Sequence, residues 1–156
     1  MDTLELDRLL SLCPVTKKYY KGCFPCNGLP LPATYPCSMI ANTDPMHERG
    51  RHWIALFISK PNYVYYFDSL GNKPNKCLLM YLSKHFINVC YNLHSYQPQY
   101  SNFCGLYCAV FLYYMSLYNN PSFAYNKLLS TLAFYVKSNP DLYIEKFVRK
   151  YFLLMS

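Results

Sequence analysis

The apolar run over residues 103–117 constrains the fold more than any other part of the chain. It is apolar on every side, which predicts a helix buried in the middle of a domain. It is too short to span a bilayer, which takes about 20 apolar residues. Cys104 and Gly105 lie in its first turn, just after polar residues 101–102, which could cap a helix.

A thiol in the first turn of a buried helix is well placed to be reactive. The unpaired backbone N–H groups and the partial positive charge of a helix N-terminus favour thiolate over thiol. Gly105 would let another part of the chain approach closely. Taken alone, a Cys at such a position is more often a small buried apolar residue. Interpreting Cys104 as a nucleophile therefore needs a base and an acid nearby, whereas Cys108, one turn on, is expected to be core.

The composition predicts one domain over residues 1–156 with one core. The chain has 156 residues, of which 53% are hydrophobic and 19% aromatic, which argues against disorder. The formal net charge of +7 suits an anionic partner such as nucleic acid, or simply a soluble basic surface. The acidic, amphipathic N-terminus is unlike a signal peptide. We therefore expect a protein that is not secreted, with its eight cysteines as reduced thiols.

The hydrophobic spacing predicts an α+β fold. Helices are expected over 3–12 and 76–86, and in two C-terminal segments that start at Asn120-Pro121 and Asn139-Pro140. Strands are expected over 53–58, 62–68 and 88–95, with 37–42 as a strand or a helical turn. Residues 13–36, rich in Pro and Gly, are expected to be loop. These elements predict a small mixed or antiparallel sheet with helices on its faces around the central buried helix.

The expected hairpin brings His52 and Asp68 together. His52 precedes its first strand and Asp68 ends its second. A three-residue loop over 59–61 would place the two directly opposite each other, with Cβ atoms about 5 Å apart on the same face. A two- or four-residue loop would turn them to opposite faces unless a bulge corrected the register. His47 is a rival base, but no expected strand holds it.

A His held by an Asp and aimed at a thiol at a helix N-terminus is an arrangement for nucleophilic catalysis. Cys104 would attack a carbonyl, and His52 would protonate the leaving amine. The oxyanion then needs donors, for which the backbone N–H of Cys104 and the amide of Gln97 are candidates. Gln99 is the rival to Gln97.

The ordered set of motifs resembles the adenovirus protease family, and more broadly the superfamily that includes SUMO-deconjugating cysteine proteases. The motifs are His52-Trp53, Tyr66-Phe67-Asp68-Ser69-Leu70-Gly71, Gln97 and Cys104-Gly105-Leu106-Tyr107-Cys108, with Cys37-Ser38-Met39-Ile40-Ala41-Asn42-Thr43 before them. The order His–Asp–Gln–Cys implies a papain-like site in permuted order, since Cys comes first in papain. The family usually has Glu where this chain has Asp68. The resemblance covers about 13–118, and 119–156 are expected to be packing helices only.

The resemblance implies His52, Asp68 and Cys104 as a triad, with Gln97 as the oxyanion donor. Trp53 would pack beside the imidazole and, with Gly105, border the substrate. The implied activity is a thiol endopeptidase that cleaves viral precursor proteins at Gly-Gly or Gly-Xaa-Gly sites, in the host nucleus or cytoplasm and in the virion.

The chemistry implied by the family needs no cofactor. Family members are activated by a viral peptide joined through a disulfide, and by DNA, and Cys90 is the nearest counterpart of the cysteine that bonds the peptide. No membrane partner is expected.

Three other interpretations stay open. The same triad could serve an isopeptidase that removes ubiquitin or a ubiquitin-like protein, or the chain could be a non-enzymatic basic protein that binds nucleic acid or capsid. Cys23 and Cys26 form a Cys-x-x-Cys pair that, with Cys13 and Cys37, could make a four-thiolate zinc site. Only one pair is closely spaced, so chance enrichment in a Cys-rich chain is preferred and no metal is expected.

Overall fold

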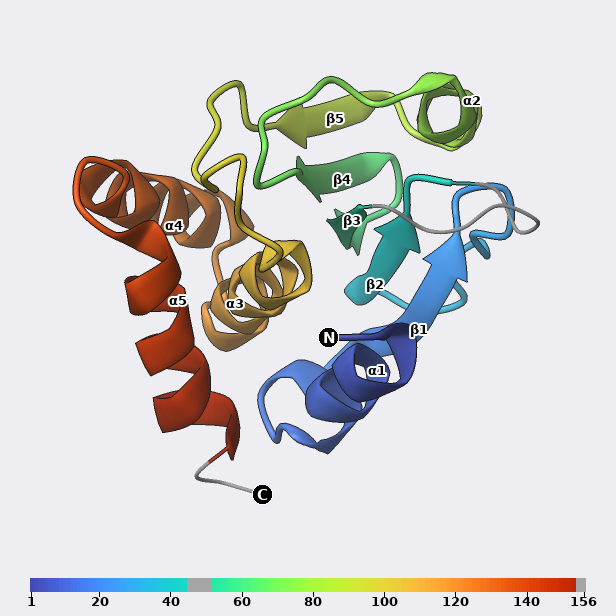
Figure 1. The fold of residues 1–156 in the computed structure, drawn as a ribbon. Helices are drawn as coiled ribbons and strands as arrows, with labels where there is room; N and C mark the ends of the chain where they lie inside the picture. The colour runs from blue at the N-terminus through green and yellow to red at the C-terminus, as the bar shows by residue number, and fades with distance from the viewer. Residues whose placement is uncertain (45–51, 154–156) are drawn as a thin grey trace.

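A five-stranded mixed sheet with helices on both faces forms the fold (Figure 1). The computed structural model describes residues 1–44 and 52–153. The strands are β1 (Tyr20–Pro25), β2 (Cys37–Asn42), β3 (Trp53–Lys60), β4 (Tyr63–Phe67) and β5 (Asn88–Tyr91), side by side in that order. The main helices are α1 (Thr3–Leu12), α2 (Lys76–His85), α3 (Cys104–Leu117), α4 (Pro121–Tyr135) and α5 (Pro140–Val148). The predicted α+β class is confirmed.

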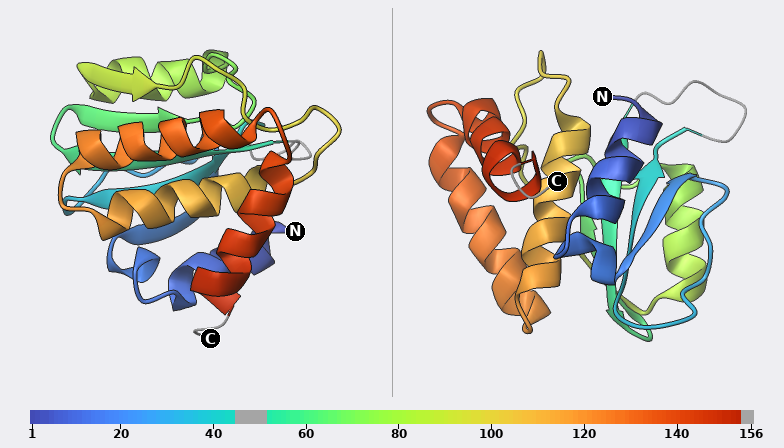
Figure 2. Two further views of the ribbon diagram at one scale, coloured as in Figure 1. Left: turned by 90° about the vertical axis from the view of Figure 1, so that its left-hand side faces the viewer. Right: turned by 90° about the horizontal axis from the view of Figure 1, so that it is seen from below.

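The two faces of the sheet carry separate hydrophobic cores. α1, α3, α4 and α5 pack on one face, around Ala55, Phe57 and Phe67. Among the helices of residues 1–44 and 52–153, α2 is the one on the other face, where its Leu78 and Leu82 meet strand residues. Figure 2 shows this division, with α2 on one side of the sheet and the other helices opposite. Within the described part of the chain, no helix is long and apolar enough to cross a membrane.

α3 is the predicted buried helix, and it begins at Cys104. It lies between the sheet and the C-terminal helices and contacts α1, α4, α5 and β3. Phe111 of α3 stacks on Phe67 of β4, with ring centroids 5.0 Å apart. The expected polar cap is wrong in detail: Phe103 is the N-cap residue and makes no side-chain cap bond, although the Ser101 hydroxyl accepts a hydrogen bond from its N–H.

The other predicted helices are also present, and the two Asn-Pro start signals are confirmed. Asp2 and Glu5 form a capping box at α1. Asn120 and Asn139 cap α4 and α5 through hydrogen bonds from the N–H groups of Phe123 and Leu142, each with Pro in the first turn. The C-terminal part therefore forms two helices, as the Asn-Pro pairs predict.

The prediction of a loop over 13–36 is wrong in part, because this segment contains β1. This edge strand pairs in parallel with β2, and its register shifts between Tyr20 and Cys23, around Gly22 at φ +141°. Gly22 and Pro25 are unfavourable in strands and so weaken the sequence pattern of β1. Its partner β2 follows only after a long connection. β5 is shorter than predicted and ends at Tyr91.

The hairpin of β3 and β4 keeps the predicted face by a different register. Its tip is a two-residue loop between Lys60 and Tyr63, and the register shifts between Ile58 and Lys60, which leaves Ser59 as a bulge. Pairs from Ile58↔Val64 to Ala55↔Phe67 therefore sum to 122 rather than the predicted 120. Positions 52 and 68 are diagonal neighbours on one face rather than directly opposed.

The prediction that all eight cysteines are reduced is wrong for two of them. Cys26, just after β1, and Cys77, in the first turn of α2, form a disulfide across 51 residues of sequence. The free thiols are Cys13, Cys23, Cys37, Cys90, Cys104 and Cys108. The four-thiolate zinc alternative is not formed, since Cys26 is bonded and no group of three metal-binding side chains occurs within 1–44 and 52–153.

Candidate active site

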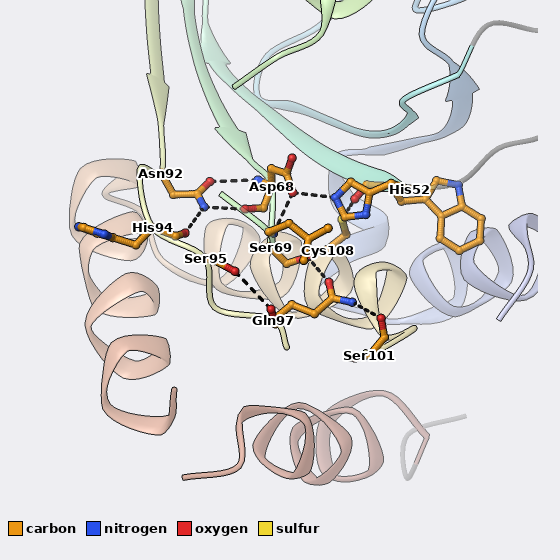
Figure 3. A network of polar contacts seen from close by, with 11 residues as sticks. His52, Asp68, Ser69, Asn92, His94, Ser95, Gln97, Ser101 and Cys108 are labelled. Carbon is orange, nitrogen blue, oxygen red and sulfur yellow. Dashed lines mark hydrogen bonds and ion pairs between the residues drawn. The ribbon is translucent and has the colours of Figure 1, made fainter. Parts of the chain in front are cut away.

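His52 and Asp68 meet at the end of the β3–β4 hairpin (Figure 3). The imidazole Nε2 lies 2.7 Å from Asp68 Oδ1, and the carboxylate residue is only 3% exposed. The same oxygen accepts the backbone N–H of Leu70 at 2.9 Å. Asp68 is therefore held on two sides. Because Nε2 faces Asp68, Nδ1 is the nitrogen left for another partner.

That other partner is Cys104, the first residue of α3. Burial, the largest single effect, lowers the pKa of His52, but hydrogen bonds and charges from Asp68 and Cys104 outweigh it and raise the pKa from 6.5 to about 9. Burial also works against the Cys104 thiolate. Hydrogen bonds from His52 and from the backbone N–H groups of Trp53 and Gly105, with the His52 charge, nevertheless lower the pKa of Cys104 below its ordinary value.

These opposite shifts favour the thiolate–imidazolium form of the Cys104–His52 pair over the neutral form. A thiolate is the nucleophilic form of Cys, and an imidazolium is a proton donor. Cys108 makes the contrast on the same helix: it is fully buried, burial raises its pKa well above the ordinary value, and its thiol donates to the Trp53 carbonyl at 3.4 Å. Cys108 is core, as predicted.

Gln97 is buried in the loop between β5 and α3, at 4% exposure. Its side-chain Oε1 accepts a hydrogen bond from the Ser69 hydroxyl, and its Nε2 donates to the Ser101 carbonyl at 2.9 Å. The amide nitrogen therefore faces the segment that leads into Cys104. The rival Gln99 is exposed. Of the two glutamines, Gln97 is the one fixed near the start of α3.

Gly105 and Trp53 are in direct contact. A Cβ atom on Gly105 would lie 2.9 Å from Trp53 Cε3 and 3.3 Å from Leu6 Cδ2. The indole ring thus rests on the first turn of α3, which only a residue without a side chain permits. This is the close approach predicted for Gly105. It fixes Trp53, and with it the neighbouring His52, relative to the thiol.

We expect Gly105→Ala to lower both stability and activity. The added methyl group must displace the Trp53 ring, and overpacking of this kind costs about 1–3 kcal/mol. Alanine's better helix propensity returns about 1 kcal/mol of that. Thermal unfolding and steady-state kinetics would measure the two effects. Ala109→Gly, a buried site on the same helix, is the matched control: it should lower stability without a comparable loss of kcat per folded molecule.

Two site residues were not predicted, Asn92 and Ser69. The side chain of Asn92 pairs with the main chain of Asp68: its Oδ1 accepts the Asp68 N–H at 3.0 Å, and its Nδ2 donates to the Asp68 carbonyl at 2.6 Å. Asn92 is the first residue after β5, whose last pair with β4 is Tyr66↔Tyr91. A polar residue directly after β5 was the available signal, but its partner could be named only with the strand order known.

Cys90 and two further histidines, His85 and His94, have other surroundings. Cys90 is exposed on β5, an edge strand of the sheet. His85 ends α2, where its ring contacts Tyr81. His94 is exposed, and its backbone carbonyl accepts a hydrogen bond from Asn92 Nδ2 at 3.1 Å. The rival base His47 lies outside the described residues.

Comparison with known proteins finds similarity to viral proteases. A family model described as adenovirus endoprotease matches residues 22–145, reaching further toward the C-terminus than the motif resemblance that ends near 118. The protease of Bovine adenovirus 4 is 32% identical over 145 residues, which cover 82% of this chain and 71% of that protein. The protease of Bovine adenovirus 7 is 30% identical over 99 residues, 54% of this chain and 49% of that one.

A solved structure gives a weaker match. The crystal structure of the ASFV pS273R protease has a TM-score of 0.38 and 19% identity to this chain. The match covers 57% of this chain and 38% of that one.

Proposed function

The chain belongs to the adenovirus endoprotease family of cysteine proteases, and we propose that Cys104, His52 and Asp68 are its catalytic triad, with Gln97 as side-chain oxyanion donor. One observation carries the proposal. The hydrogen bond and charge of His52 favour the thiolate of Cys104 at the start of the buried helix, and the buried Asp68 carboxylate lies 2.7 Å from the His52 imidazole. A cysteine endopeptidase uses a thiol, a histidine and a carboxylate in this arrangement. The non-enzymatic interpretation does not explain why the three groups are brought together.

The proposed reaction follows from the roles of these groups. The Cys104 thiolate attacks the carbonyl carbon of the scissile peptide bond, and a C–S bond forms as the π electrons move to oxygen. The backbone N–H of Cys104 and the amide of Gln97 stabilise that oxyanion. The intermediate collapses, the C–N bond breaks, and His52 gives its Nδ1 proton to the leaving amine.

Deacylation uses the same groups in reverse. His52, now neutral, takes a proton from water as the water attacks the thioester, and the carboxylic acid product leaves as the thiolate re-forms. Asp68 keeps Nε2 protonated throughout, so that Nδ1 is always the nitrogen that exchanges a proton with the reactants. Gln97 can serve the oxyanion while it stays bonded to Ser101, because its amide nitrogen carries a second hydrogen.

We propose that the substrates are viral precursor polypeptides cleaved at Gly-containing sites, in the host nucleus or cytoplasm and in the virion. The expected preference is that residues without side chains pass most readily between Trp53 and the Gln97 loop. Matched fluorogenic peptides with Gly-Gly or Ala-Ala before the scissile bond test this. We expect kcat/KM to fall at least tenfold for Ala-Ala, and equal cleavage of the pair would contradict the Gly preference.

Deconjugation of a ubiquitin-like protein is the alternative to be separated. Ubiquitin-vinyl sulfone and SUMO-vinyl sulfone would label Cys104 in an isopeptidase, because such tails end in Gly-Gly. We expect the precursor peptides to be cleaved and neither probe to react at a comparable rate. The reverse pattern would assign the site to deconjugation.

We also propose activation by a cysteine-containing viral peptide and by DNA. Cys90 supports the first, since its thiol is exposed on an edge strand beside a hollow of about 410 Å³ lined by β4 and β5. The peptide, supplied as a disulfide, would exchange with Cys90 and release a thiol. Intact mass should rise by one peptide in the wild type but not in Cys90→Ser.

The net charge of +7 supports activation by DNA. Measuring the rate of cleavage with and without DNA tests this.

A further inference from the structure

We infer that Ser69 is a positioning residue that orients the Gln97 amide for oxyanion stabilisation. This rests on the proposed role of Gln97. Ser69 is fully buried, and its hydroxyl donates to Gln97 Oε1 at 2.5 Å. A side-chain amide has an acceptor end and a donor end, and only the donor end can stabilise an oxyanion. The hydroxyl determines which end faces the reacting carbonyl.

The surroundings leave the amide one satisfactory orientation. With Oε1 toward Ser69, Nε2 donates to the Ser101 carbonyl at 2.9 Å. A flipped amide would place its oxygen against that carbonyl oxygen, where two acceptors repel. Ser69 also holds the backbone of this loop, because its carbonyl accepts the N–H groups of Tyr96 at 2.8 Å and Gln97 at 3.0 Å.

The position of Ser69 in the chain adds a second consequence. Ser69 directly follows Asp68. One dipeptide therefore positions both the carboxylate that holds His52 and, through the Ser69 hydroxyl, the Gln97 amide that stabilises the oxyanion (Figure 3). Gly71 tightens this corner: at φ +71°, a Cβ there would lie 2.6 Å from the carbonyl carbon of His94. The backbone of residues 68–71 therefore holds both the Asp68 carboxylate and the Gln97 amide in place.

The test separates oxyanion stabilisation from the reactivity of the thiolate. Acylation by p-nitrophenyl hippurate, an activated glycyl ester, passes through an oxyanion. Alkylation of Cys104 by iodoacetamide is a displacement at carbon that forms none. We expect Ser69→Ala to lower kcat for the ester by about tenfold, the effect of one ordinary hydrogen bond on a barrier. The rate of Cys104 alkylation, followed by peptide mass, should stay within twofold.

A double-mutant cycle with Gln97→Ala adds a readout that a merely structural role would not give. Gln97→Ala should lower kcat by about 10²-fold or more. The double variant should be no slower than Gln97→Ala alone, because Ser69 acts through that amide. Ser95→Ala is the matched control: its hydroxyl donates to the backbone carbonyl of Gln97 at 3.2 Å, not to the amide, so kcat should hold.

Each outcome is decisive. An unchanged kcat in Ser69→Ala, or equal losses in acylation and alkylation, would overturn the inference. If Gln97→Ala itself keeps full activity, the oxyanion assignment fails first, which distinguishes the two failures. Should Ser69→Ala not fold, Ser69→Cys fills the buried site with a weaker donor, and the same loss in acylation alone is expected.

Discussion

Replacing Cys104 with Ser is expected to lower kcat/KM for a Gly-Gly peptide by about 10⁴-fold or more. A hydroxyl in this position is not ionised by a neighbouring imidazolium, whereas the thiol has its pKa lowered by His52 and by backbone N–H groups. The change is nearly isosteric, so the fold should persist. Steady-state cleavage measures the loss, and thermal unfolding confirms that the variant is native.

The control for this variant is Cys23→Ser. Cys23 is a half-buried thiol 3.1 Å from the Tyr20 hydroxyl, a contact that serine can keep. Activity should be retained in Cys23→Ser, which shows that loss of one thiol is not in itself damaging. Undiminished cleavage by Cys104→Ser would remove the nucleophile assignment and with it the whole proposed site.

His52→Ala is expected to lower kcat by about 10³–10⁴-fold, because both the pairing of the thiolate and the proton for the leaving amine are lost. The pH profile gives the sharper evidence. In the wild type, His52 lowers the pKa of Cys104, so alkylation by iodoacetamide should become fast at a lower pH than for an ordinary thiol. In His52→Ala, burial still raises the thiol pKa with less to oppose it. Alkylation should then become fast only above the pKa of an ordinary thiol.

The alkaline side of the same profile reports on His52. As the pH rises through about 9, the imidazolium loses its proton and amide cleavage should fall, while alkylation should not. His85→Ala is the control, since that ring lies at the end of α2 and contacts Tyr81. Identical alkylation profiles for the wild type and His52→Ala would show that the histidine does not set the reactivity of Cys104.

The sequence predicts the parts of the fold that local signals specify. The capping residues and apolar spacing define α1, α4 and α5, and the continuous apolar run defines α3. β1 escapes prediction because Gly22 and Pro25 interrupt it and its pairing with β2 is non-local. The Cys26–Cys77 disulfide escapes for a similar reason, since only the packing of α2 across the sheet brings its two cysteines together.

The residues of the candidate site likewise divide into those that local sequence signals predict and those that they do not. His52, Asp68 and Cys104 could be named from the sequence because each ends or begins a recognisable element. Ser69 and Asn92 could not, because each acts through a partner more than 20 residues away, at separations of 28 and 24. Their residue types suit many turns. Only the order of the strands shows that they hold Gln97 and Asp68.

The bulge at Ser59 has a consequence for how preparations of this protein should be judged. Both faces of β3 are covered, and Ile54, Ala55, Leu56, Phe57 and Ile58 are all buried. An alternation of buried and exposed positions therefore does not fix its pairing with β4. The bulge and the tight tip, where Asn62 takes φ +67°, fix it instead. A chain slipped by one position would bury the same apolar residues yet separate His52 from Asp68. Stoichiometric titration of Cys104 counts the competent sites and would detect such molecules. Spectroscopy of the fold would not.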